Sequence, residues 1–93
     1  MKLQLITTTK FKKDLKILEK RGVQVKELYE IIERLLNMEK LESKYKDHAL
    51  SGNYRGFREC HVRPDWLFVY AIHKDKLILT AARTGTHSDL FGK

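Results

Sequence analysis

The chain has 93 residues, of which 42% are hydrophobic, and a formal net charge of +7 at pH 7. This size fits a single domain, residues 1–93, and excludes a second one. No apolar run approaches the roughly 20 residues of a membrane span, and the N-terminus lacks the long apolar stretch of a signal peptide, so we expect a cytoplasmic protein with no membrane contact. The single cysteine, Cys60, excludes an internal disulfide, and the lack of a CxxC pattern argues against structural zinc.

The N-terminal third predicts a short strand followed by an amphipathic helix. Leu3 and Leu5 alternate with polar residues, as in a strand with one buried face. Thr7-Thr8-Thr9 then offers N-cap hydroxyls, and residues 10–21 carry apolar side chains at helical spacing up to the stop signal Gly22. The apolar face of this helix consists of Phe11, Leu15 and Leu18.

A ridge of lysines lies on another side of this first helix. At 100° per residue its members gather within about a quarter-turn, away from the apolar stripe. They are Lys12, Lys13, Lys16 and Lys20. Such a ridge suits contact with phosphates as well as it suits solubility, and we take Lys13, Lys16 and Lys20 as candidate contacts to a polyanionic substrate.

A second helix is predicted over residues 25–38, and its surface is nearly neutral. Its apolar residues fall at positions spaced for burial. They are Leu28, Ile31, Ile32, Leu35 and Leu36. Residues 38–53 show no sustained period and include Ser51-Gly52-Asn53, so we expect a connecting loop that carries His48.

The C-terminal half predicts three strands. In residues 54–63 one parity holds Cys60 and Val62 and the other holds His61, and Arg63-Pro64-Asp65 forms a turn. Residues 66–72 are almost entirely apolar, as in a central strand covered on both faces, and residues 77–83 form the last strand, which Thr84-Gly85-Thr86 ends. The predicted fold is α+β in the order β-α-α-β-β-β, a small, mainly antiparallel sheet with two N-terminal helices packed on it.

Three of the four histidines, His48, His61 and His87, belong to a set of residues between Tyr45 and Phe91 that is suited to cleaving RNA without a metal. Such cleavage uses the neighbouring 2′-hydroxyl as nucleophile, so it needs a base, an acid for the 5′-oxygen, and positive charge on the phosphate. Imidazoles can serve as base and acid, because their ordinary pKa near ~6.5 lets one accept a proton while another donates. Asp65 can stabilise a charged imidazole, and Arg83 suits bidentate contact with a phosphate.

These residues also form long, ordered motifs. They are Tyr45-Lys46-Asp47-His48, Arg58 with His61-Val62, Pro64-Asp65-Trp66, and Arg83-Thr84-Gly85-Thr86-His87 followed by Leu90-Phe91-Gly92. The set resembles the YafQ subfamily of RelE-superfamily toxins, tightly so from Tyr45 to Gly92. The first half agrees in length and in the order of its elements.

The resemblance implies an endoribonuclease that cuts mRNA in the ribosomal A site. It also implies a cognate acidic antitoxin protein, bound as a hetero-oligomer, and a free toxin that is a monomer without cofactor. Carried over by position, the acid–base group is His48, His61, Asp65 and His87. Arg83 is then the contact to phosphate, while Trp66 and Phe91 are supports or base-stacking surfaces. Our working assignment makes His87 the acid and His48 or His61 the base.

Each of these residues also has a structural explanation. Asp65 is a common turn residue after proline, Trp66 opens the most apolar strand, and Phe91 can plug the C-terminus. The imidazoles and Asp65 are legitimate metal ligands, but no HExxH-like spacing supports a metal site. Three other functions stay open from the residues alone: an RNA or ribosome binder that does not cut, a ribonuclease that needs no ribosome, and a protein-interaction module.

Overall fold

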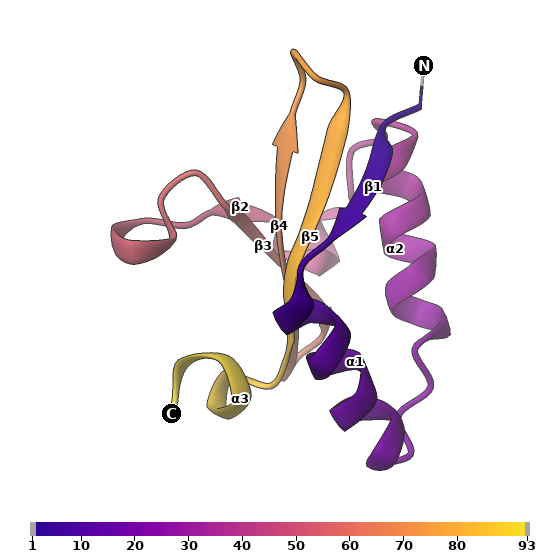
Figure 1. Ribbon diagram of the computed structural model, residues 1–93, viewed down its shortest axis with the longest axis vertical. Helices are drawn as coiled ribbons and strands as arrows, with labels where there is room; N and C mark the ends of the chain where they lie inside the picture. The colour runs from indigo at the N-terminus through magenta and orange to yellow at the C-terminus, as the bar shows by residue number, and fades with distance from the viewer. Residues whose placement is uncertain (1, 93) are drawn as a thin grey trace.

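Five strands form one sheet in the order β1-β5-β4-β3-β2 (Figure 1). The computed structural model describes residues 2–92. The strands are β1 (Gln4–Thr7), β2 (His48–Ala49), β3 (Arg58–Arg63), β4 (Trp66–His73) and β5 (Ile78–Gly85). The helices are α1 (Thr9–Lys20), α2 (Lys26–Leu36) and α3 (His87–Phe91), with short 3₁₀ turns η1 (Ser43–Tyr45) and η2 (Gly52–Tyr54). Among the strands of residues 2–92 only β1 and β5 pair in parallel, so the predicted α+β fold with a mainly antiparallel sheet is confirmed.

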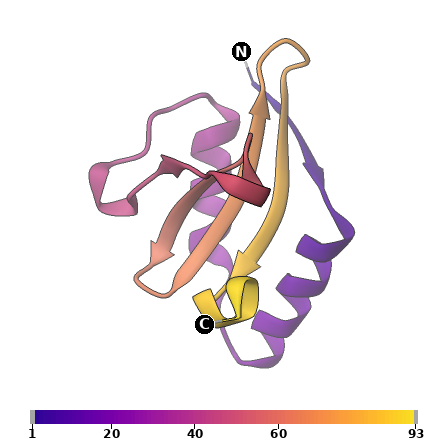
Figure 2. The same cartoon turned by 90° about the vertical axis from the view of Figure 1, so that its left-hand side faces the viewer.

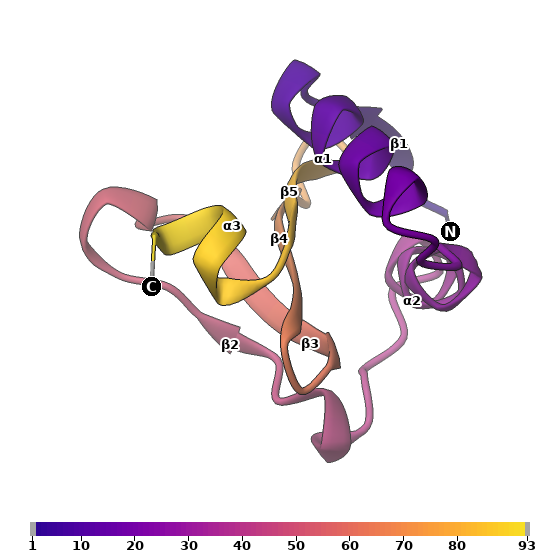
Figure 3. The same cartoon turned by 90° about the horizontal axis from the view of Figure 1, so that it is seen from below.

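The two long helices cover one face of the sheet, and α3 lies on the other side (Figure 3). On the predicted apolar face of α1, Phe11 and Leu18 are buried and Leu15 is partly buried. In α1 the hydroxyl of Thr8 accepts a hydrogen bond from the backbone N–H of Phe11 (3.0 Å), and the helix ends just before Gly22, whose φ is +81°. In α2 all five predicted apolar residues are buried. The main core therefore lies between these helices and the sheet.

β4 is the central strand, as predicted. Its first six residues, Trp66–Ala71, are all buried. Phe68 and Tyr70 face the main core, whereas Leu67 and Val69 face a smaller apolar cluster on the opposite side. That second cluster also includes Leu90, and it is completed by partly buried residues from η2, β5, α3 and the loops: Leu50, Tyr54, Phe57, Ala82 and Phe91. The second cluster fixes α3 against the sheet.

The structure differs from the prediction in three places. β3 starts at Arg58 and not at residue 54, since η2 occupies Gly52–Tyr54. The segment 38–53 is not a plain loop, because it contains η1, β2 and the start of η2, and β2 pairs His48 with Glu59 and Ala49 with Arg58. A strand of two residues has no measurable period, so the pattern could not reveal it. The last strand also runs on to Gly85 and is followed by α3, which the prediction lacked.

Asp14 of α1 completes the edge of β5. β1 pairs with β5 only along Ile78–Ala81. Beyond that point the Asp14 carboxylate accepts hydrogen bonds from the Thr84 backbone N–H (3.1 Å) and from the Arg83 Nε and Nη2 (2.7 and 3.1 Å). Asp14 is only 7% exposed, so this is an ion pair largely shielded from water. Within residues 2–92 no helix has the length and apolar character to cross a membrane.

We expect Asp14→Asn to destabilise the fold by about 3 kcal/mol, because it removes one charge of a shielded pair and leaves the Arg83 guanidinium without its counter-ion. Urea unfolding followed by circular dichroism measures this change. Glu19→Gln, on the exposed side of the same helix, is the matched control and should be neutral within about 0.5 kcal/mol. An Asp14→Asn protein as stable as wild type would show that the pair contributes nothing.

Candidate active site

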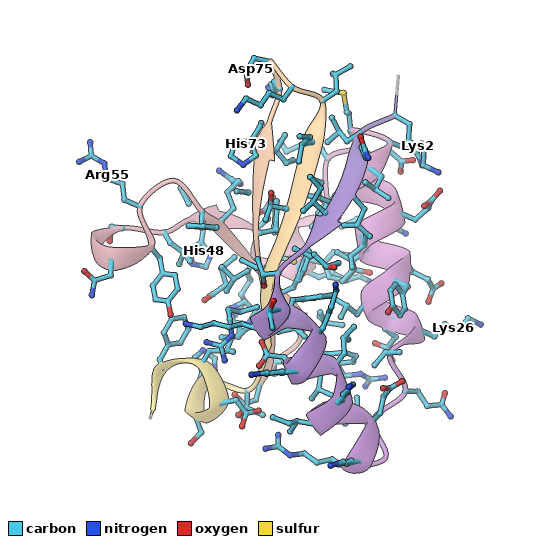
Figure 4. All side chains as sticks on the ribbon, viewed as in Figure 1. Lys2, Lys26, His48, Arg55, His73 and Asp75 are labelled. Atoms are coloured by element: carbon cyan, nitrogen blue, oxygen red, sulfur yellow. The ribbon has the colours of Figure 1, made fainter. Side chains whose placement is uncertain are left out.

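Three imidazoles meet on the side of the sheet that carries α3. Figure 2 looks onto this side, with α3 and the β2 segment in front of the strands. The ring centroids of His48 and His61 are 6.5 Å apart, and those of His61 and His87 are 5.9 Å apart. His73 lies at the end of β4 near the β4–β5 turn, well away from the labelled His48 (Figure 4). The structure thus brings together the three histidines that the sequence singled out and leaves the fourth outside.

Strand register explains this convergence. His48 of β2 pairs with Glu59 of β3, so both side chains and that of His61, two residues further along β3, project from the same face. His61 in turn pairs with Leu67 of β4, and Leu67 pairs with Gly85 of β5. The chain that leaves β5 at Gly85 therefore starts α3, and with it His87, beside His61.

Gly85 is required at this exit. Its φ is +151°, and a Cβ there would lie 3.0 Å from the Cβ of Asp89. Asp89 belongs to a capping box in which its carboxylate accepts from the Thr86 backbone N–H (3.0 Å) while the Thr86 hydroxyl accepts from the Asp89 N–H (3.0 Å). Arg21 also donates to both Asp89 carboxylate oxygens (2.8 and 2.9 Å), which ties the end of α1 to α3. These contacts fix the position of His87.

His87 is held by Asp65. Its Nδ1 lies 2.7 Å from the Asp65 Oδ1, and its backbone N–H donates to the same oxygen (3.1 Å). These two hydrogen bonds lower the pKa of Asp65. Because a carboxylate only accepts, Nδ1 carries the proton and Nε2 is the atom free to exchange one with a substrate.

The other two imidazoles are oriented by backbone carbonyls. The His48 Nδ1 lies 2.7 Å from the Lys46 carbonyl oxygen, and the His61 Nδ1 lies 3.3 Å from the Pro64 carbonyl oxygen. Since a carbonyl can only accept, each Nδ1 donates and each Nε2 points elsewhere. The Lys46 backbone has a φ of +50°, and this residue is the C-cap of η1.

Both Nε2 atoms face Glu59, a residue that the sequence analysis did not select. Its Oε1 lies 3.5 Å from the His48 Nε2 and 3.7 Å from the His61 Nε2, and the residue is only 6% exposed. The alternation in β3 already placed Glu59 on the same side as His61. This position on the same face as His61 was the feature of the sequence that could have pointed to Glu59.

Arg83 is not part of the histidine cluster. It lies on the same face, in the row that the register lines up as His48, Glu59, Val69 and Arg83. Three strand spacings of about 4.8 Å separate the ends of this row, and the buried Val69 lies in between. The hydrogen bonds to Asp14 raise the pKa of Arg83 and occupy its Nε and Nη2. The predicted contact of Arg83 with phosphate stays a prediction.

The residues predicted to contact the substrate differ in how exposed they are. Trp66 is 7% exposed and its Nε1 donates to the Thr84 hydroxyl (2.9 Å), so its surroundings fit the first of its two predicted roles, support of the core, better than base stacking. Phe91 is partly exposed and packs edge-on against Tyr54, with ring centroids 5.5 Å apart. It lies four residues after His87, on the same side of α3. The lysines of the predicted ridge are all exposed: Lys12, Lys13, Lys16 and Lys20.

Comparison with known proteins identifies the family. Residues 3–92 match the model of a family described as the YafQ toxin, a bacterial toxin of type II toxin–antitoxin systems. The chain belongs to this family. It is 42% identical over 83 residues to the mRNA interferase toxin YafQ of Escherichia coli K12, an alignment that covers 88% of each protein.

Solved structures of YafQ and related toxins share the fold. A metal-bound toxin from Helicobacter pylori is 48% identical with a TM-score of 0.89, over 96% of this chain and 99% of the other. The E. coli YafQ chain in the DinJ–YafQ toxin–antitoxin complex is 36% identical with a TM-score of 0.88, over 99% and 100%. Within residues 2–92 of the present structure, no three His, Cys, Asp or Glu side chains are grouped so as to hold a metal ion.

We expect Asp89→Asn to lower the stability of the protein by about 1 kcal/mol at pH 7, because α3 loses the charge of its capping box. The hydrogen bonds from Arg21 and Thr86 hold the pKa of Asp89 well below its usual range. Its stabilisation is therefore complete above about pH 4, the pKa of an unfolded aspartate, and is lost as the pH falls further. Urea unfolding between pH 2 and pH 7 should show wild type and variant converging below about pH 4.

Asp75→Asn is the control for this titration, since Asp75 lies in the exposed β4–β5 turn (Figure 4). In Asp75→Asn the free energy of unfolding should change between pH 7 and pH 3 by the same amount as in wild type. A constant gap between wild type and Asp89→Asn across the whole range would contradict the charge-based explanation.

Proposed function

We propose that this toxin is an mRNA interferase that cuts mRNA in the ribosomal A site by acid–base catalysis without a metal ion. Membership of the YafQ family and the 42% identity to an mRNA interferase support the target. The observation that carries the chemistry is the cluster of three imidazoles, with centroids 5.9 and 6.5 Å apart, each with a defined Nδ1 partner. Such a cluster supplies both a proton acceptor and a proton donor near pH 7.

The proposed reaction moves two protons. His48 or His61 accepts the proton of the 2′-hydroxyl through Nε2, and O2′ attacks the adjacent phosphorus. The P–O5′ bond breaks as His87 donates the proton on its Nε2 to the leaving 5′-oxygen. The products are a 2′,3′-cyclic phosphate and a 5′-hydroxyl end. Asp65 stabilises the charged form of His87 through the 2.7 Å contact at Nδ1.

The remaining contacts position the RNA. Arg83 keeps its Nη1 free of Asp14, since Asp14 accepts from Nε and Nη2, and we assign Nη1 to the phosphate of a neighbouring nucleotide. Phe91 offers a partly exposed ring on the same side of α3 as His87, a surface on which a base can stack. The exposed lysines of α1 contact backbone phosphates of mRNA or ribosomal RNA.

A protein antitoxin is the second partner. The E. coli relative forms a complex with the antitoxin DinJ, and the present chain has a net charge of +7. We propose that an acidic antitoxin binds this basic toxin and covers the histidine cluster, which keeps the toxin inactive in the cytoplasm until it is released. The free toxin is then a monomer and the inhibited form a hetero-oligomer.

We expect His87→Ala to reduce mRNA cleavage by a factor on the order of 10² to 10⁴ while leaving the fold and antitoxin binding intact. The measurement maps mRNA 5′ ends in a reconstituted translation system, with and without ribosomes. His73→Ala is the matched control, since His73 lies outside the cluster, and it should cut like wild type.

Each outcome of this experiment separates the candidate functions. Cuts within codons only in the presence of ribosomes support the interferase. Cuts in naked RNA as well would indicate a general ribonuclease, and inhibition of translation without new 5′ ends would indicate a binder that acts by occupancy. Equal cleavage by wild type and His87→Ala would overturn the assigned role of His87.

We expect the combined change of Lys13, Lys16 and Lys20 to Gln to weaken ribosome binding roughly tenfold at 150 mM salt and to flatten its salt dependence, because fewer counter-ions are released. Sedimentation of toxin with ribosomes at several salt concentrations measures both. The control changes three exposed lysines elsewhere, namely Lys26, Lys40 and Lys76. If the control weakens binding equally, net charge and not the α1 ridge is responsible.

A further inference from the structure

Glu59 has no part in the mechanism above, yet its carboxylate lies against two imidazoles of the cluster, those of His48 and His61. It is 6% exposed, with Oε1 3.5 Å from the His48 Nε2 and 3.7 Å from the His61 Nε2. A carboxylate removed from water is destabilised unless a positive charge compensates for it. The question is which group supplies that charge.

The elements around Glu59 offer few cations. β2 contributes His48, β3 contributes His61, and β4 places the apolar Val69 opposite. Among the described residues, the two imidazoles are the ion-pair partners that the structure gives to Glu59. Further away, His87 is paired with Asp65, and Arg83 is bound to Asp14. The compensating charge must therefore come from the imidazoles.

The orientation of the rings leads to the same conclusion. Both Nδ1 atoms are directed at carbonyl oxygens and carry protons, so a neutral His48 or His61 would turn the lone pair of Nε2 toward the carboxylate. Two neutral rings would thus both repel Glu59. A proton on one Nε2 turns repulsion into an ion pair, whereas protons on both rings would place two positive charges side by side.

We propose that Glu59 is a positioning residue that holds one shared positive charge on the His48–His61 pair, with its Oε1 3.5 and 3.7 Å from the two Nε2 atoms. Its part in catalysis rests on the proposed function. With one proton on the pair, the neutral imidazole accepts the proton of the 2′-hydroxyl, and the carboxylate then stabilises the doubly protonated pair. That proton returns to solvent after the product leaves.

The direct test is an NMR titration of ¹⁵N-labelled protein, which follows the imidazole nitrogens of all three histidines from pH 5 to pH 9 in wild type and in Glu59→Gln. The glutamine keeps the size of the side chain and removes its charge. We expect His48 and His61 to lose their shared proton at a lower pH in the variant than in wild type, because an opposite charge has been removed. His87 should titrate as in wild type. Identical titrations of His48 and His61 in both proteins would overturn the proposal.

Two further variants keep this test decisive. Glu30→Gln, at an exposed position of α2, is the matched control and should leave every histidine unchanged. If Glu59→Gln does not fold, His48→Gln with Glu59 intact serves instead. His61 then no longer shares the charge, so it should keep its proton to a higher pH than in wild type. A His61 titration that is unchanged or lower would contradict the shared charge.

Cleavage on ribosomes separates positioning from a merely structural role. Glu59→Gln should lower the turnover rate by a factor on the order of 10² and change KM for programmed ribosomes by less than about twofold. Unchanged turnover would overturn the part of Glu59 in the reaction. If wild type itself cuts no mRNA, the proposed function fails, whereas the NMR titration still decides whether Glu59 holds the charge of the pair.

Discussion

The hydrogen bond between the Tyr70 hydroxyl and Asp47 (2.7 Å) is the contact on which the geometry of the site depends. Tyr70 is buried in the central strand, and burial raises its pKa, so its neutral hydroxyl needs an acceptor inside the fold. Asp47 is that acceptor and also receives a hydrogen bond from the Arg58 Nε (3.3 Å). Because Asp47 directly precedes β2, these bonds set where β2 meets β3. A register slip by one residue would turn His48 away from Glu59 and His61.

The two faces of the sheet have different roles, one in folding and one in the candidate active site. The face under α1 and α2 holds the main core, and Trp66 is needed there, hydrogen-bonded to Thr84. The opposite face has only the small cluster of Leu67, Val69 and Leu90 with its neighbours, and the cluster of imidazoles lies beside it. Most of the buried apolar surface is therefore remote from the catalytic groups. Substitutions in the imidazole cluster can thus change chemistry with little effect on folding.

Periodicity and motifs in the sequence predicted much of this arrangement. The apolar stripes located α1 and α2, the unbroken run at residues 66–72 located β4, and the motifs selected His48, His61, Asp65 and His87, which the structure brings together. β2 was missed because pairing of two residues leaves no pattern, and α3 because its only local signal was the capping box from Thr86 to Asp89. Asp14 and Glu59 were missed for a different reason. A buried carboxylate is explained only by the partners that the tertiary fold places around it, here Arg83 for Asp14 and two imidazoles for Glu59.

The central claim is that the imidazoles of a YafQ-family toxin activate the 2′-hydroxyl of the mRNA itself. The most direct test is the chemistry of the new ends, determined by mass spectrometry on mRNA cut by the purified toxin on programmed ribosomes. Attack by O2′ predicts a 2′,3′-cyclic phosphate upstream of the cut and a 5′-hydroxyl downstream. A 3′-hydroxyl with a 5′-phosphate would contradict the claim, because those ends require attack by water or by another nucleophile.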